Sequence, residues 1–343
     1  MQDVLVHPFL SLVELQMTRC VSRVAKLILS LVLLYFLMRK FGLSYDKVAN
    51  GIVAPLWLVM AFVIPVGLVS FISVNRWKVF LACMGINESV VRLWRIYLIS
   101  QFQGLVLPST QGFDAVRMYH IARLHPEHAG GASGSVLIER MFGVLIWCAM
   151  AMFGLPFVLR HLSVKLPVAL IVIGFFITAV MGVMVVFNDR IHSMYIGKRP
   201  KFRLLARIVS FIGAMHDSVL HFPYAKVFRT TIAMILVCQI SAIIVVWLVF
   251  LACGVSVPLY VHLAFYPVIA IIAMMPVTIG GFGVREGAFV WFYSFLGVAP
   301  ERAICVSVVN YFAVAIVPAI VGAIVFIASE LCSSIIQRKQ GIQ

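Results

Sequence analysis

The amino-acid sequence predicts an all-α protein that crosses a membrane several times, and three observations lead to this fold class. Of the 343 residues, 63% are hydrophobic and only 11% are charged, whereas a soluble domain carries roughly a quarter charged residues. Apolar runs reach about 20 residues, the length that a helix needs to span a bilayer. The alternation typical of an outer-membrane barrel is absent from these runs. Residues 1–343 are therefore expected to form one integral membrane domain.

Six of the apolar runs are long enough to be full spanning helices. They lie near residues 21–38, 52–74, 134–158, 166–187, 229–253 and 302–329. Most Lys and Arg residues then fall on the side of the N-terminus, so the positive-inside rule predicts that both termini are cytoplasmic. The expected location is the cell inner (cytoplasmic) membrane. The net charge of +15 suits anionic lipid headgroups, and no nucleic-acid-binding module is recognised.

Two polar segments in this apolar chain repeat one pattern. "LPSTQGFDAVR" at 107–117 and "MPVTIGGFGVR" at 275–285 agree in Pro, Thr, Gly, Val and Arg. Each follows an apolar stretch and precedes a piece too short to span a bilayer of about 30 Å. Such a repeat of broken helices is typical of transporters that are built from inverted repeats.

The charge distribution also predicts how these segments enter the membrane. Residues 91–124 must begin and end on the cytoplasmic side of the membrane, and residues 261–297 must begin and end on the opposite side. Two re-entrant helical hairpins that enter from opposite faces satisfy both conditions. The alternative is that both pairs of half-helices span fully and form no hairpin.

Residues 201–222 predict a separate cytoplasmic amphipathic helix. Polar and apolar positions alternate there at helical spacing, and the polar face is basic. A helix of this kind lies in the membrane interface. A plain surface helix is the expectation, and a gate is the alternative.

The repeated motif also marks a candidate substrate site. Proline removes an N–H group and glycine permits a tight turn, so a new half-helix begins after each motif. Asp114 is expected to cap the piece that begins at Ala115. Free N–H groups at such a start attract an anion, and Arg117 and Arg285 would add positive charge. The phosphate of a membrane lipid is the expected ligand.

Other polar residues near the motifs complete this predicted site. A charge at membrane depth costs about 2.5–3.5 kcal/mol, so it should be paired or face a cavity. Partner exchange among Glu139, Arg140, Arg117 and Asp114 is expected, although these residues could instead only pin the hairpin to the bundle. The remaining candidates are the acid Glu286, the hydroxyls of Thr110 and Thr278, and the turn glycines Gly112, Gly280 and Gly281.

Neither a metal site nor a catalytic set is expected. His120, His125, Glu127 and His128 are close in sequence, but the nearby Pro and Gly residues favour an ordinary cytoplasmic loop. The seven cysteines are scattered and form no CxxC pair, which is typical of buried apolar side chains. No nucleophile elbow, Walker loop or HExxH motif occurs. We therefore expect no cofactor and no enzymatic activity from this chain alone.

Three segments of the chain resemble one known family. They are "LPSTQGFDAVRMY", "SGSVLIERMFG" and "MPVTIGGFGVREGAFVWFYSFLGV". In order and spacing they are similar to the motifs of the membrane region of lysylphosphatidylglycerol synthases, which are flippase-like integral membrane proteins. The third motif is the most specific. The first departs from the pattern at Phe113, where the family usually has a second glycine.

The resemblance implies a lipid translocator. In full-length synthases a separate soluble domain transfers the amino acid, and the last predicted helix here is followed by only a short tail, so translocation without synthesis is expected. The implied substrates are anionic or zwitterionic phospholipids, aminoacyl-lipids and isoprenoid-linked lipids. The alternatives are a membrane subunit of a lipid-modifying transferase, whose catalytic domain is a separate chain, and a scaffold that does not transport.

Overall fold

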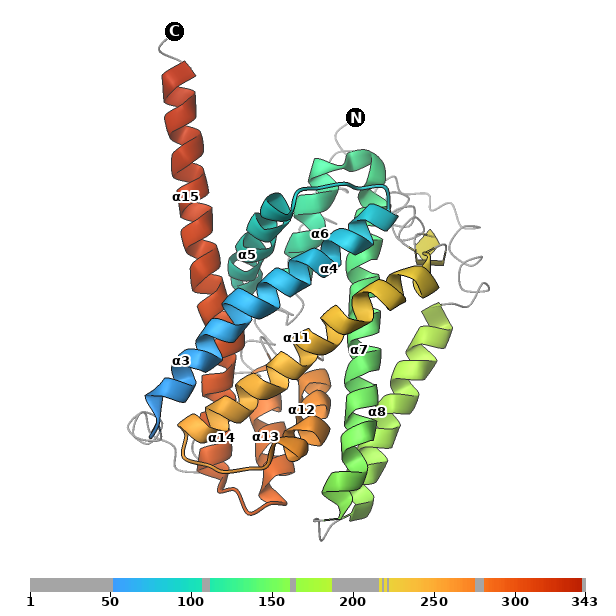
Figure 1. Ribbon diagram of the computed structural model, residues 1–343, viewed down its shortest axis with the longest axis vertical. Helices are drawn as coiled ribbons and strands as arrows, with labels where there is room; N and C mark the ends of the chain where they lie inside the picture. The colour runs from blue at the N-terminus through green and yellow to red at the C-terminus, as the bar shows by residue number, and fades with distance from the viewer. Residues whose placement is uncertain are drawn as a thin grey trace, which may run out of the picture.

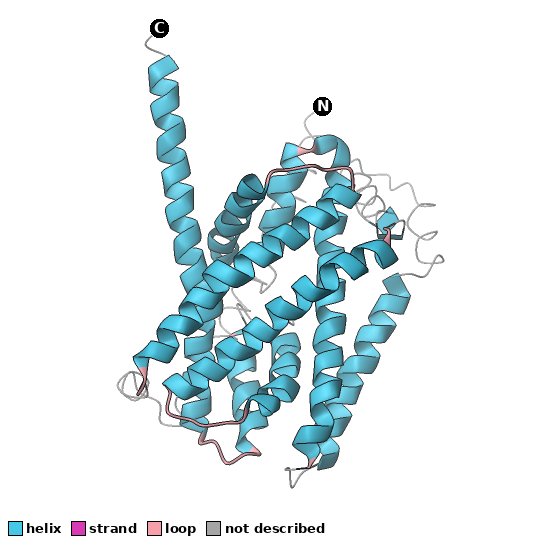
Figure 2. Ribbon diagram, viewed as in Figure 1, coloured by secondary structure: helices cyan, strands magenta, loops and turns pink. Residues whose placement is uncertain are grey.

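The computed structural model describes residues 52–106, 112–160, 165–186, 222–274 and 281–340, together with residues 216, 217, 219 and 220. These residues form helices joined by short loops, and no strand occurs among them (Figure 2). This confirms the predicted all-α class. By length and composition, four described helices can cross a membrane: Pro55–Cys83, Pro126–Phe157, Arg229–Ala252 and Pro300–Ser329. The spanning helix predicted at 21–38 lies outside the described residues.

The first described rod is longer than predicted. Helix α3 (Pro55–Ile64), the π-helical turn η1 (Pro65–Val69) and helix α4 (Ser70–Cys83) follow one another without a break (Figure 1). The predicted span ended at residue 74, where polar residues begin. The helix continues because one face of its last turns remains buried, including Trp77 and Phe80.

Helices α5 (Val90–Val106) and α6 (Gly112–Leu124) occupy the first predicted hairpin. Both are shorter than the roughly 20 residues of a full span. Their backbones are in close contact, because a Cβ atom on Gly104 would lie 2.5 Å from the backbone nitrogen of Phe113. Only glycine permits this approach, which brings the start of α6 against the end of α5.

The middle of the chain contains two long helices that pack together. The short 3₁₀ turn η2 (Pro126–His128) leads into α7 (Ala129–Leu159), and α8 (Lys165–Val186) returns beside it (Figure 1). Both agree with the predicted helices. The amphipathic helix predicted at 201–222 lies largely outside the described residues, and its four described positions from 216 to 220 are helical.

Helix α11 (Tyr224–Ala252) runs alongside the α3–α4 rod (Figure 1). Two short helices follow where the second hairpin was predicted, α12 (Leu259–Met274) and α13 (Val284–Ser294). Gly281 and Gly283, directly before α13, have φ angles of 73° and 82°. Residues other than glycine rarely adopt such backbone angles. This confirms that a tight turn at the second motif precedes the new half-helix.

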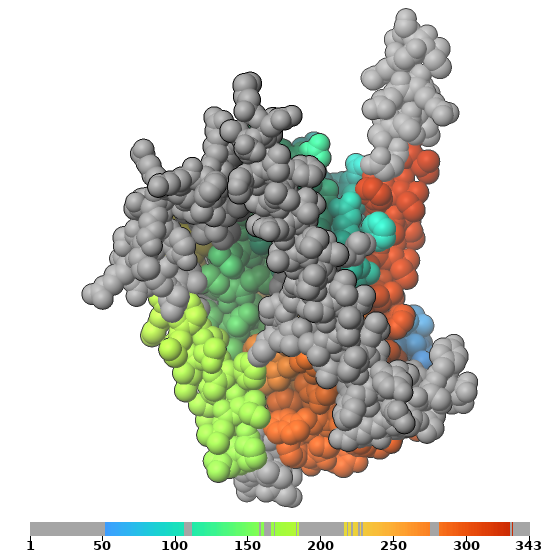
Figure 3. All heavy atoms as spheres, turned by 180° about the vertical axis from the view of Figure 1, so that it is seen from behind, coloured from blue at the N-terminus to red at the C-terminus, as the bar shows by residue number. Residues whose placement is uncertain are grey.

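The described chain ends in another long rod. It consists of α14 (Pro300–Tyr311), the π-helical turn η4 (Phe312–Ile316) and α15 (Val317–Gln340). Seen from behind, the orange residues near α13 and α14 lie beside the yellow-green α8 in the lower half of the molecule (Figure 3).

The outward faces of several helices carry large apolar side chains, as expected for contact with lipid. Exposed examples are Leu56, Val59 and Val63 on α3, Leu170, Met181 and Met184 on α8, and Ile320, Ile324 and Ile327 on α15. Together with the long apolar helices, this surface indicates a multi-pass membrane protein. The polar side chains described next lie inside the bundle.

Candidate functional site

A network of five charged side chains lies between α4, α6 and α7; Asp114, Arg117 and Glu139 are buried, whereas the side chains of Arg76 and Arg140 are 12% and 36% exposed. Arg117 Nη2 lies 2.8 Å from Glu139 Oε2 and 3.2 Å from Asp114 Oδ1. Arg76 pairs with the same Glu139, and Arg140 pairs with Asp114. We call these five residues the first ionic centre. Because unpaired charges inside a membrane protein are costly, the ion pairs explain how five charges are accommodated.

Helix geometry explains why these side chains meet. Asp114 and Arg117 are three residues apart on α6, so they lie on one face. Glu139 and Arg140 are adjacent on α7, and each pairs with different partners. This confirms the partner exchange predicted for these four residues. The predicted N-cap at Asp114 is wrong, because α6 begins at Gly112 and Asp114 lies in its first turn.

Arg117 is enclosed by aromatic rings. Its guanidinium carbon lies 4.8 Å from the ring centroid of Trp77 and 5.0 Å from that of Phe113. Phe113 also packs edge-on against Tyr97, with 4.8 Å between the ring centroids. The residue that departs from the family pattern therefore forms one wall around this arginine. Cation–π contacts of this kind stabilise and orient a desolvated guanidinium.

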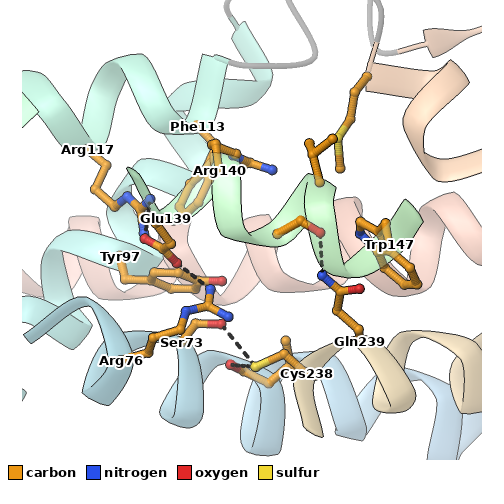
Figure 4. A pocket seen from close by; sticks show the side chains of 14 residues that line it. Ser73, Arg76, Tyr97, Phe113, Arg117, Glu139, Arg140, Trp147, Cys238 and Gln239 are labelled. Atoms are coloured by element: carbon orange, nitrogen blue, oxygen red, sulfur yellow. Dashed lines mark hydrogen bonds and ion pairs between the residues drawn. The ribbon is translucent and has the colours of Figure 1, made fainter. Parts of the chain in front are cut away.

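The first ionic centre borders a cavity of about 230 Å³, here named the arginine cavity (Figure 4). Its walls come from α4, α5, α6, α7 and α11, and from Met274 at the end of α12. Polar and aromatic lining residues are Ser73, Arg76, Tyr97, Phe113, Arg117, Glu139, Arg140, Trp147 and Gln239. Three arginines against two carboxylates leave one positive charge in excess at this site.

Donor groups in the arginine network remain available. Among the described residues, the Nε atoms of Arg76 and Arg117 have no hydrogen-bond partner. Gln239 is held in place, because its Nε2 donates to the carbonyl oxygen of Gly143 at 2.8 Å. A bound anion would give these arginines the acceptors that they lack.

A second ionic centre, consisting of Arg285, Glu286 and Ser307, joins α13 to α14. Arg285 Nε lies 3.1 Å from Glu286 Oε1 and 3.1 Å from Ser307 Oγ. Glu286 Oε2 accepts a hydrogen bond of 2.6 Å from the backbone nitrogen of Gly283. The Arg285 guanidinium carbon lies 4.3 Å from the ring centroid of Tyr311. Arg285 and Glu286 thus stabilise the start of α13, and among the described residues they do not line the arginine cavity.

The predicted site residues therefore divide into three groups. Asp114, Arg117, Glu139 and Arg140 meet at the first centre, and Arg285 and Glu286 form the second. Gly112 is buried at the start of α6, and Gly281 provides the turn before α13. Thr110, Thr278 and Gly280 lie outside the described residues.

Sequence reasoning missed Arg76 as a site residue. Arg76 follows an apolar run in the sequence, so there it looks like one of the positive charges that flank a span. In the structure its side chain is only 12% exposed and pairs with Glu139. The helical spacing of buried Ser73, Trp77 and Phe80 was the available signal that the helix continues through this arginine.

The histidine-rich segment packs against neighbouring polar residues. His125 Nε2 lies 3.0 Å from Glu88 Oε1, and His120 Nε2 lies 2.8 Å from Gln103 Oε1. Within the described parts of the chain, no group of three or more potential metal ligands occurs. His120 thus connects α6 to α5, and His125 connects the loop after α6 to the loop before α5.

Long apolar helices around a buried arginine–carboxylate network define a multi-pass membrane protein with an internal polar site. Comparison with known families identifies the group. Residues 23–322 match the model of the family described as "Lysylphosphatidylglycerol synthase TM region". The chain belongs to this family, which confirms the resemblance drawn from its three motifs.

The chain is also similar to archaeal membrane proteins. One is UPF0104 membrane protein MJ1595 of Methanocaldococcus jannaschii, which is 23% identical over 329 residues, covering 92% of this chain and 96% of the relative. A UPF0104 membrane protein of Methanothermobacter thermautotrophicus is 22% identical over 272 residues, covering 75% of this chain and 80% of the relative. The similarity thus extends along most of the chain.

Proposed function

We propose that this protein moves a phosphate-bearing lipid between the leaflets of the cell inner membrane. The substrate is an anionic or zwitterionic phospholipid, an aminoacyl-lipid or an isoprenoid-linked lipid. The observation that carries this proposal is the arginine cavity, where three arginines and two carboxylates meet inside an apolar bundle. If these side chains only held the helices together, equal numbers of positive and negative charges would be sufficient.

The charge balance suits a lipid phosphate. One excess positive charge matches a phosphodiester, which carries one negative charge. Arginine binds phosphate through two parallel N–H groups, so it provides geometry as well as charge. The cavity volume of about 230 Å³ is small for a whole ligand, since pockets for drug-sized molecules measure about 300–1,000 Å³. It fits the phosphate region of a headgroup while the hydrocarbon chains stay in the bilayer.

The two predicted re-entrant hairpins belong to this proposal. Helices α5 and α6, and helices α12 and α13, are each too short to span alone. Met274, which directly precedes the second motif, lines the same cavity as Phe113 and Arg117 of the first. This supports an arrangement in which both motifs approach one polar interior from opposite faces, with both chain termini in the cytoplasm.

A reconstituted leaflet-exchange assay tests the proposal. Purified protein would be placed in vesicles of phosphatidylethanolamine and phosphatidylglycerol that carry a trace of one fluorescent probe. The probes are phosphatidylglycerol, phosphatidylethanolamine and a polyprenyl phosphate, each quenched from outside. Exchange of at least one probe above that of protein-free vesicles is expected. Exchange of none refutes translocation.

Arginine variants then test the site. Arg117→Lys keeps the charge but loses the two-pronged geometry, so we expect at least about a tenfold loss of rate. Arg285→Ala is expected to abolish exchange in protein that still elutes folded from size-exclusion chromatography, a check that is needed because the buried Glu286 loses its partner. The matched control is Arg123→Lys, an exposed position on the same helix α6. Wild-type rates for Arg117→Lys or Arg285→Ala would remove that residue from the site.

A second candidate function follows from the family description, which names the membrane region of a synthase. In that case the chain is the membrane subunit of a lipid-modifying transferase, and its partner is a separate chain. A transferase that co-purifies with the full-length protein, together with absent leaflet exchange, would favour this candidate.

A further inference from the structure

A second cavity of about 150 Å³ lies beside the arginine cavity. Its lining residues are Pro65, Val69, Tyr97, Gln101, Ala242, Val245, Tyr266, Val314 and Pro318. We propose that this tyrosine cavity is a transit site, through which the phosphate headgroup passes between the first and the second ionic centre. The inference rests on the proposed function and adds a path and its residues to it.

One end of the tyrosine cavity adjoins the first ionic centre. Val69 and Tyr97 line both cavities, so the two spaces are separated by shared side chains. Tyr97 packs edge-on against Phe113, whose ring lies 5.0 Å from the guanidinium carbon of Arg117. A headgroup that leaves Arg117 therefore meets the Tyr97 side chain first.

Another lining residue, Tyr266, is linked to the second ionic centre through Asn310. The Tyr266 hydroxyl accepts a hydrogen bond of 3.5 Å from Asn310 Nδ2. Asn310 is followed by Tyr311, whose ring packs on the Arg285 guanidinium. The tyrosine cavity thus adjoins the first ionic centre through Val69 and Tyr97, and its residue Tyr266 is linked to the second through Asn310 and Tyr311.

The polar groups of the tyrosine cavity favour a headgroup over a hydrocarbon chain. Tyr97, Gln101 and Tyr266 place two hydroxyls and one amide in a wall that is otherwise apolar. Polar groups favour surroundings in which they form hydrogen bonds, and a hydrocarbon chain would offer none beyond the bond that the Tyr266 hydroxyl accepts from Asn310. Asn310 Oδ1, beside Tyr266, is buried and has no hydrogen-bond partner among the described residues. A hydrated headgroup supplies donors and acceptors for all of these groups.

The chemistry of the wall also suits brief occupancy. Neutral hydroxyl and amide donors bind a phosphate more weakly than arginine does, because arginine adds a full positive charge and two parallel N–H groups. A headgroup would therefore pass through the tyrosine cavity and rest at the arginines. Weak intermediate binding of this kind is what passage through a pore requires.

Both π-helical turns of the described chain contribute to the wall. Pro65 and Val69 belong to η1, Val314 belongs to η4, and Pro318 follows η4 by two residues. Such turns interrupt the regular helix and occur frequently at functional sites. They lie where two long rods would have to separate for a headgroup to pass.

Two substitutions test the transit site in the leaflet-exchange assay. Tyr266→Phe removes one hydroxyl without changing the shape, and we expect at least a fivefold lower rate. Ala242→Trp fills the cavity without removing a polar group, and we expect the rate to fall to that of protein-free vesicles. The matched controls are Tyr119→Phe and Ile240→Trp, whose side chains are 59% and 45% exposed. Both controls should exchange lipid at the wild-type rate.

Lipid retention separates transit from binding. Native mass spectrometry of the detergent-purified protein, with phosphatidylglycerol as the added probe, should find wild-type retention for Tyr266→Phe and Ala242→Trp. Arg117→Lys should retain less. If both cavity variants exchange lipid at the wild-type rate while Arg117→Lys does not, the transit site is refuted and the proposed function stands. If wild-type protein exchanges no probe, the proposed function itself fails.

Discussion

Replacing Glu139 by Gln should destabilise the protein strongly, because this carboxylate neutralises two buried arginines. Its side chain is 6% exposed, lies 2.8 Å from Arg117 and also pairs with Arg76. Two unit charges about 4 Å apart interact with about 4 kcal/mol at an effective dielectric constant of 20. Breaking a buried pair by removing one partner costs about 3–5 kcal/mol. Both estimates predict that E139Q lowers the free energy of unfolding by about 3–5 kcal/mol.

A double-mutant cycle with Arg76→Gln measures this interaction. Folded protein in detergent would be followed by size-exclusion chromatography after heating. The single variant E139Q should lower the apparent melting temperature by roughly 6–20 °C, since 1 kcal/mol corresponds to about 2–4 °C in domains of 150–250 residues. The double variant R76Q/E139Q removes one charge of each sign, so its loss should be about 0.5–3 kcal/mol smaller than the sum of the single losses.

Additive losses in this cycle would contradict the pairing of Arg76 with Glu139, and so would an unchanged melting temperature for E139Q. The control is Glu127→Gln, because the Glu127 side chain is 62% exposed in the 3₁₀ turn η2. The stability of that variant should match the wild type.

Two further predictions concern packing and pH. In α15, a Cβ atom at Gly322 would lie 2.0 Å from the carbonyl oxygen of Leu98, so Gly322→Ala should cost at least about 1–3 kcal/mol of stability. The control is Gly174→Ala, because a Cβ atom at Gly174 on α8 would meet no other atom. This variant should be neutral or slightly stabilising. Equal melting temperatures for the two variants would contradict the close contact of α15 with α5. For the loop pair, burial favours the neutral acid, but hydrogen bonds from His125 and Arg92 hold the pKa of Glu88 below its usual value. This contribution is present above about pH 4.3 and is lost as the pH falls further. Glu88→Gln should therefore melt below the wild type at neutral pH, and the difference should shrink in acid; a constant difference across this range would contradict the ion pair.

The positions of most described helices were predictable, but the extent of one was not. Apolar runs located α7, α8 and α11 within a few residues, because length and hydropathy alone determine whether a segment suits a bilayer. The α3–α4 rod passes the predicted end at residue 74, since Trp77 and Arg76 are buried by helices that are distant in the sequence. A local pattern contains no information about such neighbours.

The candidate site was predictable only in part, because a local sequence pattern shows which residues are charged but not which residues they contact. Charged residues in apolar runs must be paired, and this identified Asp114, Arg117, Glu139 and Arg140. Which acid pairs with which base was left open, because it depends on how α6 and α7 are turned towards each other. Phe113 appeared only as a departure from a motif, whereas its contact with Arg117 required coordinates.

The sequence by itself determined that this chain is a helical membrane protein of the lysylphosphatidylglycerol synthase family and that its motif residues carry charge into the bundle. Composition and local sequence patterns are sufficient for these conclusions, because the side chains of each segment decide whether it lies in lipid or in water. Only the tertiary structure decided that Arg76 joins the first ionic centre and that a second cavity shares Val69 and Tyr97 with the arginine cavity. Those facts depend on contacts between residues far apart in the chain, which arise when the helices pack.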